Sequence, residues 1–456
     1  MADEGVLRGT SVIVAGAGLA GLAAAVDLAN AGAQVTVVEA RDRVGGRVWT
    51  LRDGWRNGQH AEAGADLIDE GQEEMQRLVA RLGLELVPIL EGGFGFVMRG
   101  EDGPPCMSGG PGSVGWRTLR ERLEPRIRGY RLVDRRWDSL VAQDMARTSV
   151  AEWLDEVKAD AKMRALARGL RGFFLADPAD LSLLVLVDQL AADVPGGGRM
   201  YRIKGGNDRL ASGLAHMLGE LMHIRTEVRA VSQTRDNVRL RLRTGNGTES
   251  DMSADYLVCA VPATVLRDIV CDPPLPPEQE QAVLRLNYGP ATRTMLQFER
   301  RFWRHSGKRR AYGTDLPIGA VWDGNEEQSG NEGILSLLAG GSASVETQQI
   351  IAHEGVEGLV RQLEWLGVNQ LPVLSSRVIS WENDPWARGG YAYFDPAYDP
   401  AWRPWLSKPH GRIVFAGEHT SVQWQGYMNG AVESGLRAAK EVGVLVDRSR
   451  RFASPP

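Results

Sequence analysis

The hydrophobic and polar positions follow their most regular pattern in residues 11–50. Ser11 to Ala15 is an apolar run without polar alternation, which predicts a strand buried on both faces of a parallel sheet. An alanine-rich segment, about Leu19 to Ala31, predicts a helix, and Gln34 to Val38 repeats the apolar strand pattern. This order of strand, helix and strand is typical of a Rossmann-type α/β unit.

Three glycines in the pattern G-x-G-x-x-G connect the first strand to the helix: Gly16, Gly18 and Gly21. The first permits a tight turn, the second lets the backbone approach a pyrophosphate, and the third lets the helix pack close to the strand. The helix N-terminus offers free N–H groups to phosphate. Glu39 ends the second strand 18 residues after Gly21 and can accept hydrogen bonds from ribose hydroxyls. The motif predicts a dinucleotide site without distinguishing NAD from FAD.

A second glycine pair and several arginines follow the acid directly. Arg41, Gly46 and Arg47 could hold a pyrophosphate from its other side, because a guanidinium matches phosphate oxygens in a fork. Without the preceding motif, the same residues would be interpreted as a basic surface loop.

Beyond this opening unit, strand and helix patterns alternate. Gln72 to Leu82 places apolar residues on one helical face, and Leu84 to Met98 alternates loosely, which predicts a hairpin. Residues 116–194 contain few turn formers and predict a helical insertion. Within it, Ser149 and Glu152 have the spacing of a capping box.

The totals narrow the class of protein. A chain of 456 residues is expected to form two or three domains, and 43% hydrophobic with 24% charged residues is typical of a soluble globular protein. A net charge of -5 argues against a general nucleic-acid binder. The three cysteines and seven histidines lack metal-ligand spacing, and no secretory signal or apolar membrane span is evident. We therefore expect a cytoplasmic protein without a metal or a membrane anchor.

Segments spread over the whole length resemble the flavin-containing monoamine oxidase family. They are VEARDRVGGRVW near the front, LNYGPATRTMLQFERRFW in the middle, then WENDPWARGGYAYF, and finally GRIVFAGEHTSVQWQGYMNGAVESGLRAA. Several matching segments in the same order are more specific than any one of them. The resemblance implies a mixed α/β fold, with a Rossmann-type FAD-binding domain of the glutathione-reductase type interleaved with a substrate domain of mixed sheet and helical insertion.

These two domains are expected to be built from segments far apart in the sequence. Residues 1–75, 200–285 and 385–450 would form the FAD-binding domain. Residues 76–199 and 286–384 would form the substrate-binding domain, including the helical insertion.

The resemblance implies a set of residues that hold FAD. Glu39 would bind the adenosine ribose, and Val228 would meet the adenine through its backbone. Glu418 would lie by the ribityl chain and the pyrophosphate, and the helix near Met428 would point at the isoalloxazine ring. The other residues assigned to the cofactor are Gly16, Gly18, Ala20, Gly21, Ala40, Arg41, Gly46, Arg47, Gly64, Ala65, Gly417 and Ala431.

Two aromatic rings flank the substrate in this family, and Tyr391 and Tyr427 match their positions. Two facing rings give an amine an apolar slot and a cation–π surface; as the alternative, each is an ordinary core tyrosine. Some family members attach FAD covalently through a cysteine just before the first ring. Gly390 stands there in this chain, so we predict non-covalent FAD.

Two further departures from the family pattern concern reactivity and substrate. The family usually has a lysine, bridged by water to flavin N5, where this chain has Arg293. Arginine stays protonated, which leaves the speed of reoxidation by oxygen open, and Arg293 pairing with a surface acid is the alternative. Leu67 stands where L-amino-acid oxidases hold a substrate carboxylate with arginine, so a simple amine is favoured.

These observations give one main hypothesis and three alternatives. The chain would be an FAD-dependent oxidase of a primary or secondary amine, with Tyr391, Tyr427 and Arg293 as catalytic residues and oxygen as the second substrate. The alternatives are an L-amino-acid oxidase, a flavin desaturase of a large apolar substrate, and a non-catalytic flavin-binding scaffold. His419 is expected to be structural, or to orient a water near the flavin. A homodimer is left open.

Overall fold

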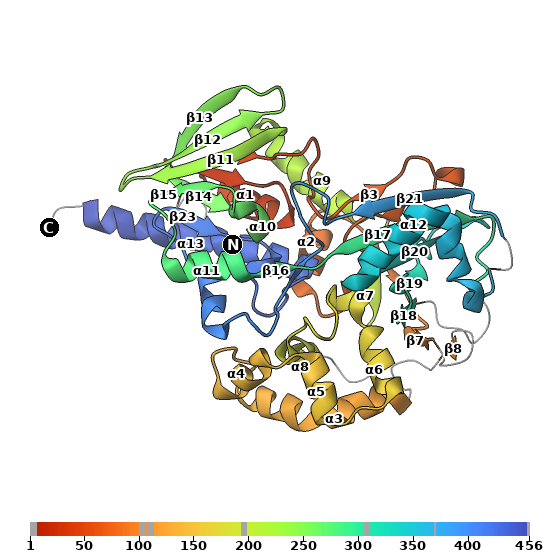
Figure 1. Ribbon diagram of the computed structural model, residues 1–456. Helices are drawn as coiled ribbons and strands as arrows, with labels where there is room; N and C mark the ends of the chain where they lie inside the picture. The colour runs from red at the N-terminus through yellow and green to blue at the C-terminus, as the bar shows by residue number, and fades with distance from the viewer. Residues whose placement is uncertain are drawn as a thin grey trace.

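A five-stranded sheet carries the opening unit of the chain (Figure 1). The computed structural model describes residues 7–99, 106–107, 114–192, 198–304, 311–368 and 371–453. All neighbouring strands of this sheet pair in parallel. Their order is β10 (Met222–His223), β2 (Gln34–Val38), β1 (Ser11–Ala15), β14 (Tyr256–Cys259) and β23 (Ile413–Phe415). The two predicted strands and the helix between them are therefore confirmed.

The two faces of the parallel sheet are covered by different layers, as the alternation of side chains along a strand requires. Val12 and Val14 pack against helices, whereas Ile13 and Ala15 belong to the core on the opposite face. The helices that cover the Val12 and Val14 face are α1 (Leu19–Asn30), α9 (Asp208–Leu218) and α13 (Met428–Ala453). The other layer is a sheet of β11 (Thr226–Gln233), β12 (Val238–Thr244), β13 (Glu249–Ala254) and β15 (Val270–Asp272).

A seven-stranded mixed sheet forms the second half of the structure, at the right of Figure 1. Its order is β21 (Ser375–Ser380), β17 (Ala291–Phe298), β20 (Gly333–Gly340), β19 (Ala320–Asp323), β18 (Ala311–Thr314), β7 (Phe94–Met98) and β8 (Cys106–Met107). α12 (Ser342–Arg361) packs against β20 and β17.

The predicted hairpin over Leu84 to Met98 is wrong. β6 (Leu86–Ile89) pairs with β9 (Met200–Ile203), whereas β7 pairs with β18 and β8. β8 follows β7 closely, but β9 and β18 lie far along the chain, and local alternation does not reveal them. β5 (Ile68–Asp69) completes the three-stranded sheet of β5, β9 and β6.

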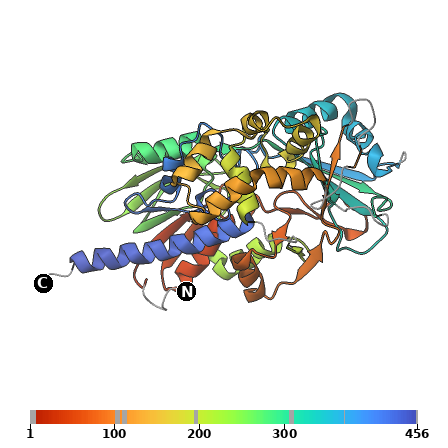
Figure 2. The same ribbon diagram turned by 90° about the horizontal axis from the view of Figure 1, so that it is seen from below.

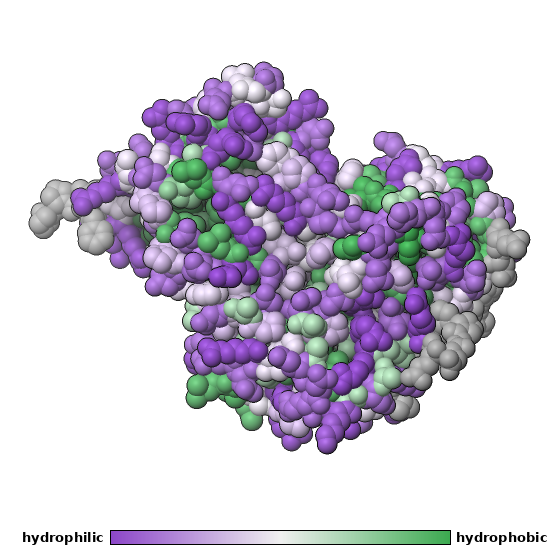
Figure 3. Space-filling model, in the orientation of Figure 1, coloured by the Kyte–Doolittle hydropathy of each residue, from purple (hydrophilic) through white to green (hydrophobic). Residues whose placement is uncertain are grey.

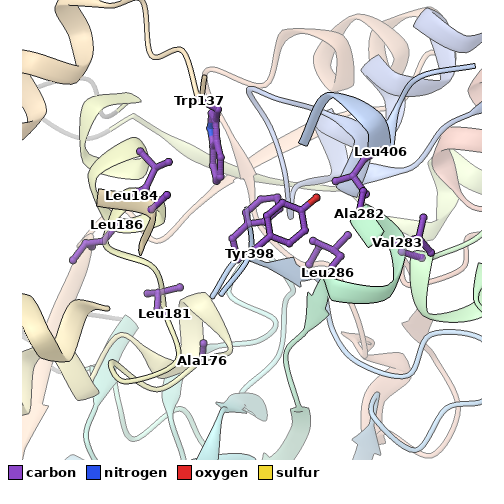
Figure 4. Packing of buried hydrophobic residues seen from close by; sticks show 14 of the residues in the cluster. Trp137, Ala176, Leu181, Leu184, Leu186, Ala282, Val283, Leu286, Tyr398 and Leu406 are labelled. Carbon is purple, nitrogen blue, oxygen red and sulfur yellow. The ribbon is translucent and has the colours of Figure 1, made fainter. Parts of the chain in front are cut away.

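Residues 114–192 consist of six helices, which we call the helical layer 114–192 (Figure 2). Ser149 and Glu152 form the predicted capping box at the start of α5. Trp137, Leu184 and Leu186 belong to the same hydrophobic cluster as Tyr398 and Leu406 (Figure 4), so the core of this layer continues into the C-terminal part of the chain. The helices are α3 (Val114–Leu132), α4 (Leu140–Arg147), α5 (Val150–Glu156), α6 (Ala161–Arg168), α7 (Arg171–Phe174) and α8 (Leu183–Ala192).

The remaining short elements connect these layers. α2 (Glu73–Arg81) lies within the predicted helix 72–82 and packs on α13. The others are β3 (Thr50–Leu51), β4 (Ala61–Glu62), α10 (Ala263–Leu266), α11 (Pro277–Arg285), β16 (Asn287–Tyr288) and β22 (Ala392–Tyr393).

Polar side chains cover most of the face in Figure 3, and the hydrophobic residues on it form small separate patches. Within the described ranges, none of the helices combines the length and the apolar character that a membrane span requires.

A buried charge network joins the seven-stranded sheet to the three-stranded one. Asp66 accepts hydrogen bonds from Arg202 on β9, from Arg293 on β17 and, at 2.7 Å, from the indole of Trp322 on β19. Burial alone would raise the pKa of Asp66, but the two guanidinium charges outweigh it and hold this pKa below its ordinary value. Glu62 lies beside this network without a cation of its own, and burial with the charge of Asp66 raises its pKa to about 8.

Glu62 should make stability depend on pH. Between about pH 4.5 and 8 the folded state keeps a proton on Glu62 that the unfolded state has released, so its contribution to the free energy of unfolding falls as pH rises. Glu62→Gln mimics the protonated form and should be more stable than the wild type at pH 8, with a difference that shrinks toward pH 5. Urea unfolding at several pH values measures this, with the exposed Glu121→Gln as control. A difference that does not change with pH would contradict the assignment.

Two glycines of α13 should respond oppositely to substitution. A Cβ on Gly435 would overlap the carbonyl of Ala20 and lie 3.1 Å from the amide nitrogen of Ala24, both on α1, whereas a Cβ on Gly443 would meet nothing within 4 Å. We expect Gly435→Ala to destabilise the fold by about 1–3 kcal/mol. Gly443→Ala should stabilise it by about 0.5–1 kcal/mol, because alanine restricts the unfolded chain. Thermal and urea unfolding of the matched pair measure both effects, and equal shifts would refute close packing of α1 on α13.

Candidate active site

One cavity of about 1660 Å³ extends from the carboxyl end of the parallel sheet to the helical layer 114–192. Strand ends, glycine turns and helix starts from all parts of the chain line it. Of the residues predicted for cofactor and substrate, Gly21 alone does not reach its wall. The others line it: Gly16, Gly18, Ala20, Glu39, Ala40, Arg41, Gly46, Arg47, Gly64, Ala65, Val228, Arg293, Tyr391, Gly417, Glu418, Tyr427, Met428 and Ala431.

The glycine motif forms the wall at the end of β1. Gly16 has φ 103°, a conformation that favours glycine, and Gly18 caps α1 without any side-chain hydrogen bond to the first N–H groups. A Cβ on Gly21 would overlap the carbonyl of Gly16, so this glycine allows the helix to approach the strand. The second glycine turn faces the first, because a Cβ on Gly46 would lie 3.5 Å from Gly18 Cα. Two backbone turns without side chains thus face the same space.

Glu39 closes β2 at this end of the cavity. Its carboxylate accepts N–H hydrogen bonds from Ala17 at 2.7 Å and Arg41 at 2.8 Å, and burial raises its pKa. The Arg41 side chain lines the cavity but is bound to both carboxylate oxygens of Asp384, at 2.5 and 2.6 Å. Its guanidinium is therefore already paired with a protein carboxylate.

Arg47, which is partly buried, and Glu418, which is buried, form an ion pair of 3.0 Å in the site. The Arg47 guanidinium also donates to the carbonyl of Gly390 at 2.7 Å, and Glu418 accepts from the N–H of Gly426 at 2.8 Å. Burial would lower the pKa of Arg47, but Glu418 outweighs this effect and raises it. The pair therefore binds the backbone immediately before Tyr391 and immediately before Tyr427.

Tyr391 and Tyr427 line the same part of the cavity. A Cβ on Gly426 would lie 3.4 Å from the ring of Tyr391, which places this ring beside the backbone that leads to Tyr427. The Tyr391 hydroxyl donates to the carbonyl of Phe173, and the Tyr427 hydroxyl donates to Gln189 Oε1 at 2.9 Å. Burial, and then the nearby Tyr427, raise the pKa of Tyr391, so its phenol stays neutral.

Arg293 is fully buried and lines the cavity next to Trp322. Its guanidinium lies 4.2 Å from the centre of the Trp322 ring, donates to the Glu62 carbonyl at 3.1 Å and pairs with Asp66. The partner of Arg293 is therefore a buried acid at the cavity wall, and the alternative of a surface acid is wrong.

Small residues and one histidine complete the surroundings. A Cβ on Gly64 would overlap the Arg47 carbonyl and lie 3.2 Å from the Trp381 ring, so only glycine fits there. His419 is buried but does not line the cavity, and burial lowers its pKa to about 4, which keeps it neutral. This favours the structural interpretation of His419.

Sequence reasoning missed several residues of the site. Trp424 lines the cavity, and its ring meets that of Tyr427 edge to face at 5.6 Å. Its position three residues before Tyr427 was an available signal. Phe173, Gln189 and Asp66 had none, because only the fold brings them to the two tyrosines and to Arg293. In the part of the chain that the structure describes, no group of three His, Cys, Asp or Glu side chains could hold a metal.

Comparisons with known proteins show which proteins this chain resembles over its length. A Mycobacterium tuberculosis protein named as a flavin-containing monoamine oxidase, AofH, is 29% identical over 95% of this chain and 97% of its own length. An L-amino-acid oxidase of Bungarus fasciatus is 27% identical over 97% of this chain and 88% of its own. The solved cyclohexylamine oxidase of Brevibacterium oxydans shares the fold, with a TM-score of 0.83 at 24% identity over 96% of this chain and 100% of its own.

The family described as flavin containing amine oxidoreductase matches residues 19–443, which is nearly the whole chain. The chain therefore belongs to the flavin-containing amine oxidoreductase family, and it is an FAD-dependent enzyme that oxidises amines.

Proposed function

We propose that this enzyme oxidises a primary or secondary amine without an α-carboxylate, held between Tyr391 and Tyr427. The observation that carries the proposal is that both tyrosines line one cavity with the glycine motif of β1 and α1. A slot of two aromatic side chains therefore opens onto a space suited to a dinucleotide.

The residues present fit non-covalent FAD. The uncapped N-terminus of α1 and the facing turns at Gly18 and Gly46 suit a pyrophosphate. Glu39 would take the ribose, and Val228 would meet the adenine. The small residues Gly64, Ala65, Gly417 and Ala431, with Met428 at the start of α13, would surround the ring system.

The chemistry divides between cofactor and protein. Bound FAD would supply the redox chemistry, by hydride transfer from the α-carbon of the amine to flavin N5. The imine product would hydrolyse to a carbonyl compound, and oxygen would take the electrons as hydrogen peroxide. The chain supplies orientation and a dry slot, since both tyrosines are held by hydroxyl hydrogen bonds and the phenol of Tyr391 is neutral. Arg293 stays protonated at the cavity wall, where Asp66 neutralises it.

Leu67 supports an amine over an α-amino acid. It lines the cavity and packs with Ile89, Leu90 and Trp322, so that wall is apolar where a carboxylate would need a cation. We also propose a cytoplasmic enzyme, because Cys259 and Cys271 are free thiols.

The purified holoenzyme should be bleached by simple amines in the absence of oxygen, and should release hydrogen peroxide in air. Tyr427→Ala should lower kcat/KM by about tenfold or more while flavin content stays normal, because the ring supplies the apolar and cation–π face. A panel of amines, with L-amino acids as a second series, followed by flavin absorbance and a peroxide assay measures this.

Three results would redirect the proposal. Bleaching by L-amino acids alone would favour the L-amino-acid oxidase, and turnover of large apolar alkenes would favour a desaturase. Bound FAD that no amine reduces would indicate a scaffold.

A cysteine at residue 390 should not capture the flavin by itself. A Cβ on Gly390 would overlap Leu175 Cδ1 and lie 2.9 Å from Ala291 Cβ, so the thiol would be displaced. We expect Gly390→Cys to release its flavin on acid denaturation, and Gly390→Cys with Leu175→Ala to retain more of it. Flavin fluorescence of the denatured protein on gels measures attachment, with Leu175→Ala as control. Complete covalent attachment of the flavin in Gly390→Cys alone would contradict this prediction, because it would show that Leu175 does not displace the thiol.

A further inference from the structure

Each of the two tyrosines of the slot is held at two points, at the backbone just before it and at its hydroxyl group. At the backbone, the Arg47–Glu418 pair binds the Gly390 carbonyl and the Gly426 N–H, which precede Tyr391 and Tyr427. At the hydroxyl, both rings donate to the helical layer 114–192. The backbone anchor and the hydroxyl anchor thus come from different parts of the fold.

The hydroxyl anchor of Tyr391 is rigid. The acceptor is the carbonyl of Phe173 on α7, a helix in close contact with the seven-stranded sheet. A Cβ on Gly172 would lie 2.6 Å from the Ala320 nitrogen and 2.7 Å from the Leu338 carbonyl oxygen. No side-chain substitution removes a backbone carbonyl, so this anchor is part of the fold.

Leu175 reinforces this rigid anchor. It is fully buried and has φ 55°, an unusual conformation for leucine that persists only where packing enforces it. Three glycines from separate segments give it room, since a Cβ on Gly289, Gly340 or Gly390 would overlap it. The strain lies immediately beside Tyr391, where it fixes the end of α7.

The hydroxyl anchor of Tyr427 is a side chain. Gln189 on α8 lines the cavity, and its Oε1 accepts from the Tyr427 hydroxyl at 2.9 Å. The Tyr427 ring also meets the Trp424 ring edge to face, with centroids 5.6 Å apart. We propose that Gln189 is a positioning residue: its hydrogen bond from α8 fixes the angle of the Tyr427 ring and thereby the width of the substrate slot. This inference rests on the proposed function of the slot.

A double-mutant cycle tests the proposal in the holoenzyme. Gln189→Leu removes the acceptor at similar length, and Tyr427→Phe removes the donor but keeps the ring. For an amine that bleaches the flavin, we expect each variant to lower kcat/KM by about three- to tenfold, which corresponds to the free energy of one neutral hydrogen bond. The double variant should lose no more than either single one, because both act on the same bond. Gln189→Glu, which keeps an acceptor oxygen, should recover most of kcat.

A second readout needs no substrate. The visible circular dichroism of the bound flavin should change alike in Gln189→Leu, Tyr427→Phe and the double variant, because the same ring is released. Leu184→Met is the matched control: it lies on α8, is buried, and does not line the cavity, so it should leave both the spectrum and kcat/KM unchanged.

The outcomes separate this inference from the proposed function. Losses that multiply in the double variant, or a spectral change in Tyr427→Phe that Gln189→Leu lacks, would overturn the positioning role. If no amine bleaches the wild type, the proposed function fails, and the spectra still decide whether Gln189 holds Tyr427.

Discussion

The ion pair between the partly buried Arg47 and the buried Glu418 is the contact on which the site depends. Removing a charge from water is costly, and mutual attraction offsets this cost only when further hydrogen bonds complete the geometry. Those bonds exist here, from Arg47 to the Gly390 carbonyl and from the Gly426 N–H to Glu418. One pair therefore joins the front of the chain to two segments more than 340 residues away. Its main effect is to place the chain beside both tyrosines rather than to add stability.

Close packing explains why glycines surround this pair. The layers that meet at the cavity come from the parallel sheet, the seven-stranded sheet and the helical layer 114–192, and each contact brings backbone against backbone. Gly64 against the Arg47 carbonyl and Gly435 against α1 are two such contacts. Since interiors are packed at the density of organic crystals, a single added carbon at these positions must move a whole element. The geometry of the slot is well defined because no element of its wall can move without moving its neighbours.

The sequence predicted the elements whose pattern is local. The apolar strands and the glycine turn of residues 11–38 and the capping box at Ser149 are specified by neighbouring residues, and the resemblance supplied Tyr391 and Tyr427. It did not predict that β6 pairs with β9 and β7 with β18, because these partners lie far along the chain. The sequence also did not predict that the Phe173 carbonyl and Gln189 accept hydrogen bonds from the two tyrosines. Acceptors that the fold brings from α7 and α8 have no signature in the sequence.

Arg293 is a second buried charge that requires a partner. A lysine in a dry site can lose its proton, whereas a guanidinium stays charged and must be neutralised by a partner. Asp66 is that partner, and it is shared with Arg202, whose second contact is Glu327 at 2.9 Å. The substitution at 293 therefore makes sense only together with Asp66 and Arg202. Because Arg293 and Asp66 both line the cavity, this network places a paired guanidinium and carboxylate at its wall.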